Sequence, residues 1–86
     1  MSAASDEIKR RAANVVLGRL GEEMIEVVKL HLRRSYSITF DLKDNAKFSL
    51  DQLHFGLSVL LGEGLANNLM RQIKDEIDEI SKVQIH

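Results

Sequence analysis

A chain of 86 residues with no cysteine and a net charge of −1 falls outside several classes of protein. Its length accommodates one domain at most, it offers no disulfide framework or thiolate chemistry, and it lacks the strong basic excess typical of nucleic-acid binders. No apolar run approaches the length of a membrane span, and the N-terminus places charges where a secretory signal needs apolar residues. We therefore expect one cytoplasmic domain over residues 1–86, with residues 1–7 disordered.

The first third of the chain predicts two helices. A first helix can begin at Ser5 or Asp6, and apolar residues at helical spacing follow it. Gly18 and Gly21 weaken its continuation, because each glycine costs about 1 kcal/mol relative to alanine inside a helix. We expect a break near Gly21 and a second helix from there to Ser35, although one long helix remains the alternative. Acidic residues begin the second helix and arginines end it, which suits the helix dipole.

Residues 36–42 change the period of the sequence. Tyr36, Ile38, Phe40 and Leu42 are apolar, and polar residues alternate with them, which predicts an extended segment or a short strand. A lone strand cannot satisfy its own backbone groups. The segment must therefore lie over the helices as an ordered arm, pair with the tail at 83–85, or pair with a second copy of the chain.

The second half of the chain predicts two further helices joined by a glycine turn. Ser49 can cap a helix over 50–61, with Gln52 placed to return a hydrogen bond to the cap and Phe48 and Leu53 placed as a hydrophobic staple. We expect Gly62 and Gly64 to break that helix before another over 65–82 begins. The fold class predicted is an all-α, compact bundle of about four helices, with the extended segment between the second and third.

The long fourth helix offers apolar positions near its outer end. Ile77 and Ile80 continue its apolar stripe, and a helix of about 27 Å can extend beyond so small a core. These positions are available for a partner chain. Together with the alternating segment, they give the predicted partner or dimer interface: Tyr36, Ile38, Phe40, Leu42, Ile77 and Ile80.

Residues that could carry chemistry form no convincing site. His31 and His54 are predicted on different helices and lack the spacing of a metal motif. Acidic residues of the last helix are scattered around its outer face, typical of a solvated surface. Gly62-Glu-Gly64 could present backbone amides to an anion, but Glu63 would repel phosphate. We expect no catalytic residues, no cofactor and no metal ion, and hence a protein that is not an enzyme.

Basic residues of the first helix are the alternative functional surface. Two helices joined by a short turn suggest a helix-turn-helix protein, but the second of them is net acidic and would be repelled by phosphate. Binding of DNA or RNA would therefore depend on the N-terminal basic residues. These candidates are Lys9, Arg10, Arg11 and Arg19.

The chain also resembles a small domain family of archaea, whose members are short orphan proteins or domains known especially from ammonia-oxidising lineages. The shared pattern is a helix ending in His-Leu, a Tyr-x-Ile stretch, and a capped helix ending in a Leu-Gly-x-Gly turn. It covers about residues 17–80 and rests on His31, Leu32, Tyr36, Ile38, Leu61, Gly62 and Gly64. The resemblance implies an intracellular archaeal module of no settled activity, with no catalytic residues to transfer.

Two functional hypotheses follow from the sequence. The first is a non-catalytic module that binds a partner protein or a second copy of itself as a homodimer, without a membrane. The alternative is a small DNA- or RNA-binding regulator that uses the basic residues of the first helix. A metal or ligand sensor built around His31 and His54 is a weaker third hypothesis.

Overall fold

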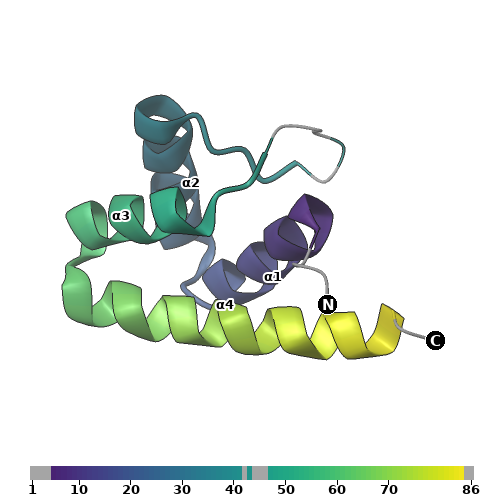
Figure 1. Ribbon diagram of the computed structural model, residues 1–86. Helices are drawn as coiled ribbons and strands as arrows, with labels where there is room; N and C mark the ends of the chain where they lie inside the picture. The colour runs from purple at the N-terminus through teal and green to yellow at the C-terminus, as the bar shows by residue number, and fades with distance from the viewer. Residues whose placement is uncertain (1–4, 42, 44–46, 85–86) are drawn as a thin grey trace.

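The computed structural model describes residues 5–41, 43 and 47–84, and four α-helices account for most of them (Figure 1). They are α1 (Asp6–Gly18), α2 (Glu22–Tyr36), α3 (Leu50–Leu61) and α4 (Glu63–Gln84). No strand occurs within the described ranges. The predicted all-α bundle is therefore confirmed. Residues 1–4 lie outside the described residues, whereas Asp6 and Glu7, which we expected to be disordered, form the first turn of α1.

The first two helices begin and end where local chemistry directs. Ser5 caps α1, because its Oγ accepts a hydrogen bond from the backbone N–H of Ile8 at 3.2 Å. Gly21 has a φ of 97°, a value that L-residues rarely adopt. This turn separates α1 from α2, so the predicted break is confirmed and the single long helix is wrong. The second helix runs one residue further than expected, to Tyr36, and Ser37 ends it in the left-handed conformation.

A second glycine turn joins α3 to α4. Ser49 Oγ accepts a hydrogen bond from the N–H of Gln52 at 3.2 Å, which confirms the predicted cap. Gly62 has a φ of 92° and ends α3. Only this glycine forms the break: α4 already begins at Glu63, so Gly64 lies inside its first turn, contrary to the prediction. Glu63 supplies the negative charge that a helix N-terminus favours.

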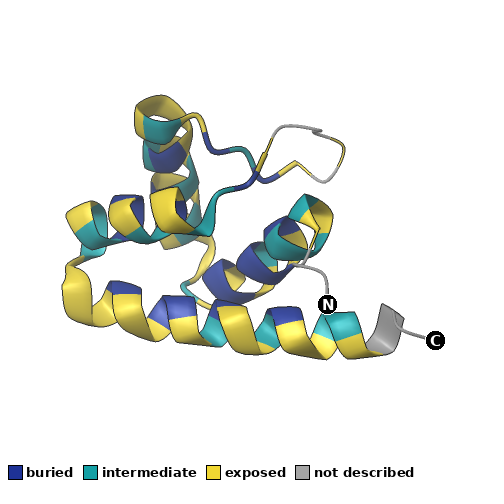
Figure 2. Cartoon of the chain, in the orientation of Figure 1, coloured by how far each residue is buried: buried dark blue, intermediate teal, exposed yellow. Residues whose placement is uncertain are grey.

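The helices enclose a single hydrophobic cluster. Figure 1 shows α4 running along one side of the molecule, with α1 and α3 packed on it and α2 beside α3. Figure 2 shows that the buried residues of α1, α3 and α4 lie on their facing sides. Gly56 marks a close approach of α3 to α2, where any added side chain would meet Leu32 and Tyr36. The core side chains are Ala12, Ala13, Val16, Leu17, Val28, Leu32, Ile38, Phe40, Phe48, Leu53, Leu57, Ala66, Leu69, Met70, Ile73 and Ile77.

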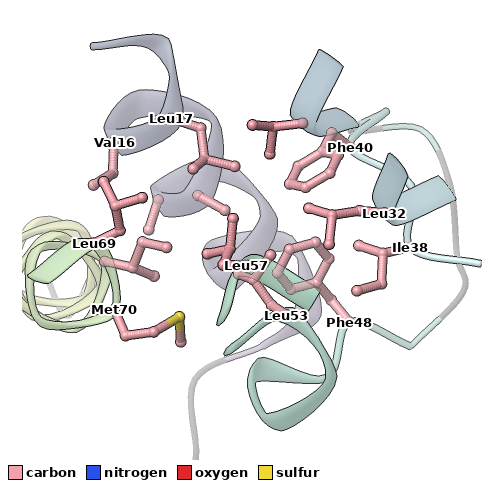
Figure 3. Close-up of a cluster of buried hydrophobic side chains, with 14 of the residues drawn as sticks. Val16, Leu17, Leu32, Ile38, Phe40, Phe48, Leu53, Leu57, Leu69 and Met70 are labelled. Atoms are coloured by element: carbon pink, nitrogen blue, oxygen red, sulfur yellow. The ribbon is translucent and has the colours of Figure 1, made fainter. Parts of the chain in front are cut away.

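The segment between α2 and α3 belongs to this core. Arg10 Nε donates a hydrogen bond to the carbonyl oxygen of Thr39 at 2.9 Å, and Asn14 Nδ2 donates one to that of Phe40 at 3.0 Å. Both donors lie on α1, one turn apart. Ile38 and Phe40 are buried, and Figure 3 shows their side chains pointing into the cluster. The segment is thus an ordered arm that α1 holds over the core.

The expected extent of this arm needs correction. Tyr36 is helical, residues 38–41 are not helical, and Leu42 lies outside the described residues. Pairing with the tail as a strand is also wrong for its described residues, since Val83 and Gln84 belong to α4, while Ile85 lies outside the described residues. Side chains of α1 donate to the carbonyls of Thr39 and Phe40 in place of a neighbouring strand.

Candidate protein-interaction surface

Two large apolar side chains project from α3 into solvent. Leu53, Gly56 and Leu57 occupy the buried face of this helix, and the helical period of 3.6 residues places Phe55 and Val59 on the opposite side. Phe55 is 61% exposed and Val59 is 59% exposed. They are the most exposed large hydrophobic residues within the described ranges. Because they lie one turn apart, they form one continuous apolar surface.

Aromatic contacts extend this surface from α3 to α2. The ring of Phe55 meets that of Tyr36 edge to face, with 5.8 Å between ring centroids, and Tyr36 meets His31 in the same way at 5.7 Å. Such pairs contribute about 0.5–1.5 kcal/mol beyond the burial of area. Phe55 is therefore held in place from one side while most of its ring faces solvent. A side chain fixed in this way loses little conformational freedom when a partner covers it.

Polar groups surround the apolar pair. Phe55 and Val59 line a shallow hollow of about 500 Å³ together with Asp51, His54, Ser58 and Glu63. His54 Nε2 lies 2.7 Å from Oδ1 of Asn67, and Ser58 Oγ donates a hydrogen bond to the backbone carbonyl of His54 at 2.9 Å. The side chains of His54 and Ser58 thus already have hydrogen-bond partners within the chain. The two carboxylates make no ion pair with any described residue.

A second groove lies between α2 and the arm. It measures about 580 Å³, and its walls are residues 38–41 on one side and Glu26, Lys29, Leu30 and Arg33 on the other. Lys29 Nζ lies 5.6 Å from the ring centroid of Phe40, a favourable cation–π distance. Two acidic and two basic side chains line the groove, so its charge favours neither an anionic nor a cationic ligand.

The interface residues predicted from the sequence are largely used inside the chain. Ile38, Phe40 and Ile77 are buried, Ile80 and Tyr36 are partly buried against the core, and Leu42 lies outside the described residues. Phe40 packs edge to face on Phe48, with 5.5 Å between ring centroids. In this fold the buried members have no surface to offer a second chain.

The predicted basic residues, three on α1 and Arg19 directly after it, make contacts within the chain. Arg10 is only 2% exposed, and its guanidinium lies 5.3 Å from the ring centroid of Phe48. Arg19 donates a hydrogen bond to Gln72 at 2.9 Å and lies 3.7 Å from Glu76 on α4. The remaining two pair within α1, Lys9 with Asp6 at 3.9 Å and Arg11 with Glu7 at 3.4 Å. Arg10 is therefore unavailable for phosphate contacts, whereas the side chains of Arg11 and Arg19 remain 47% and 57% exposed.

The two histidines do not meet in a metal site. His31 contacts Tyr36, whereas His54 contacts Asn67 on α4. His31 Nε2 is enclosed and has no hydrogen-bond partner among the described residues. No group of three or more histidine, aspartate or glutamate residues within the described ranges is placed to hold a metal ion.

Sequence reasoning overlooked Phe55 and Val59. It placed no interface residue on the third helix, whereas Phe55 and Val59 lie on the face opposite the buried one. Large apolar residues on the polar face of an amphipathic helix are the signal that could have identified them.

Comparisons of the chain with family models, with curated proteins and with solved structures found no match. The resemblance to an archaeal domain family therefore stays a prediction. Within the described residues, no helix combines the length and the apolar character that crossing a bilayer requires.

Proposed function

We propose that this chain is a non-catalytic protein-interaction module that associates with itself. The observation that carries the proposal is the apolar surface of Phe55 and Val59 on α3, which the chain's own core does not cover. An exposed apolar patch rimmed by polar residues is typical of a protein–protein contact. Further large apolar residues are at least 43% exposed on α2, namely Met24, Val27 and Leu30.

The physical reason for association is the free energy of removing these side chains from water. Burial of apolar surface contributes about 25 cal/mol per Å², and aromatic residues anchor many interfaces. Tyr36 already packs on one edge of Phe55, so a partner needs to cover only the remaining ring surface. The contact that fixes one edge of the Phe55 ring is thus already present in the single chain.

Sedimentation velocity from micromolar to millimolar concentration tests this proposal. We expect the mass of the wild-type protein to rise with concentration, and a Phe55→Ser/Val59→Ser variant to remain monomeric while keeping its helical circular dichroism. Val15→Ser is the matched control, because Val15 is an exposed apolar residue on α1 away from this surface. A wild-type protein that stays monomeric over the whole range would contradict the proposal.

Nucleic-acid binding is less well supported by the same structure, since Arg10 is buried and Arg19 is tied to α4. A gel shift with duplex DNA at low salt distinguishes the two functions. We expect no shift. Binding that weakened with salt, and that was lost in Lys9→Ala/Arg11→Ala, would favour the regulator instead.

A further inference from the structure

The apolar surface of α3 is bracketed by negative charge. Asp51, Phe55, Val59 and Glu63 follow one another at intervals of four residues, and all four line the same hollow. We call these four residues the acidic stripe. Both carboxylates are exposed, and neither forms an ion pair with a described residue. The stripe therefore offers two apolar anchors between two carboxylates that form no ion pair with a described residue.

A complementary surface lies on α2. Val27 is 53% exposed and Leu30 is 49% exposed, and together with Arg34 they fall on one face of the helix at spacings of three and four. Arg33 and Arg34 lie in the last turn of this helix, both are exposed, and neither forms an ion pair with any residue that the structure describes. We call Val27, Leu30, Arg33 and Arg34 the basic stripe.

We propose that the partner for each stripe is the opposite stripe of a second copy of this chain. The inference rests on the proposed self-association and specifies its interface. α2 and α3 are neighbours within the chain, and the proposed dimer has a twofold axis that sets the α2 of each copy against the α3 of the other. The contact is then made twice, as a closed symmetric dimer requires.

The charges on the two helices favour this arrangement over two other symmetric dimers, in which α3 packs on α3 or α2 packs on α2. Packing α3 on its own copy would bring four carboxylates of Asp51 and Glu63 together, and packing α2 on its own copy would bring four arginines together. Like charges that meet across an interface oppose association, whereas opposite charges favour it. Glu23 and Glu26 precede Val27 and Leu30 by one turn of α2, so the proposed pairing requires α2 to cross α3 near its arginine end.

The area that a stable dimer buries calls for residues from more than one helix. A standard interface buries about 800 Å² on each partner, which is a substantial part of the 5816 Å² accessible to solvent on this chain. Phe55 and Val59 at their observed exposure supply only about 200 Å². A stable dimer therefore needs apolar residues from more than one helix, and α2 and α3 together provide them.

A charge-swap experiment tests the pairing. One variant carries Asp51→Lys/Glu63→Lys, and the other carries Arg33→Glu/Arg34→Glu. Each variant alone presents two stripes of the same sign, so we expect its self-association in sedimentation equilibrium at low salt to weaken by about tenfold or more. In an equal mixture, the new lysines of the first variant face the new glutamates on α2 of the second. The native arginines on α2 of the first variant face the native Asp51 and Glu63 of the second. We expect the mixture to form heterodimers with near wild-type affinity.

Matched controls exclude effects of net charge alone. Asp75→Lys/Asp78→Lys and Arg71→Glu/Lys74→Glu reverse the same numbers of charges at exposed positions of α4, and both should associate as the wild type does. Circular dichroism verifies that every variant is folded, since the reversals also act on helix ends.

The outcomes separate this inference from the proposed function. A monomeric wild-type protein would remove both. A wild-type dimer whose affinity the swaps do not change, or whose variants do not recover on mixing, would overturn the pairing of the stripes and leave self-association in place through another face. Weakening of each variant together with recovery in the mixture supports the pairing.

Discussion

Gly56 provides the sharpest test of how α2 packs on α3. In a Gly56→Ala variant, the new Cβ would lie 3.0 Å from Cε2 of Tyr36 and closer still to Cδ2 of Leu32. Both distances are shorter than normal van der Waals contact. Leu32 is fully buried, so its methyl group cannot move away without displacing other core side chains.

Two opposing terms set the size of this effect. Alanine favours the helix over glycine by about 1 kcal/mol, whereas overpacking a well-filled core costs about 1–3 kcal/mol. Because the contact is with a fully buried leucine, we expect the steric term to dominate. With the steric cost in the upper part of its range, about 2–3 kcal/mol, the net destabilisation should be about 1–2 kcal/mol. For a domain of this size, each kcal/mol corresponds to about 4–8 °C in melting temperature.

Gly64→Ala is the matched control. Gly64 also lies inside a helix, but a Cβ added there would meet nothing within 4 Å, so only the helix propensity changes. We expect this variant to be more stable than wild type by about 0.5–1 kcal/mol. Thermal and urea unfolding followed by circular dichroism, at one fixed protein concentration, measures both. A Gly56→Ala variant that is as stable as the wild type would refute the close packing described here.

Three further predictions concern the core and its edges. Arg10→Ala should lower the free energy of unfolding by about 2–4 kcal/mol, because it removes the hydrogen bond to Thr39 and the packing on Phe48; full stability in urea would contradict this. Phe48→Ala should cost about 3–4 kcal/mol, since Phe48 is 1% exposed, whereas Phe55→Ala should change the monomer by less than about 1 kcal/mol in the same assay. Ser49→Ala should cost about 1 kcal/mol in thermal unfolding through loss of the cap, and Ser49→Asp should keep most of that stability.

The parts of the fold that sequence reasoning predicted are those set by neighbouring residues. A cap at Ser49 and a turn at Gly21 or Gly62 depend on groups three or four positions apart, so local chemistry is sufficient to find them. Gly64 was assigned wrongly because a glycine within the first turn of a helix looks the same in the sequence as one in the turn that precedes it.

The parts that it missed depend on residues far apart in the chain. Arg10 looks like a solvent-exposed charge until its acceptor, the carbonyl of Thr39, is known to lie beside it. Ile38 and Phe40 have the alternation of a strand edge, and only the donors of α1 show that they belong to the core. Phe55 is the exception, because its position opposite Leu53 and Leu57 on α3 follows from the helical period alone.

The contacts that α1 makes with α4 and with the arm have a consequence during synthesis. This helix packs on α4, and its side chains reach the arm 26 to 29 positions later in the chain. A ribosome-bound fragment that ends before α4 therefore lacks the surface that covers Val16 and Leu17. We expect such nascent chains to expose these residues, to engage chaperones that recognise apolar segments, and to close cooperatively only once α4 has left the exit tunnel.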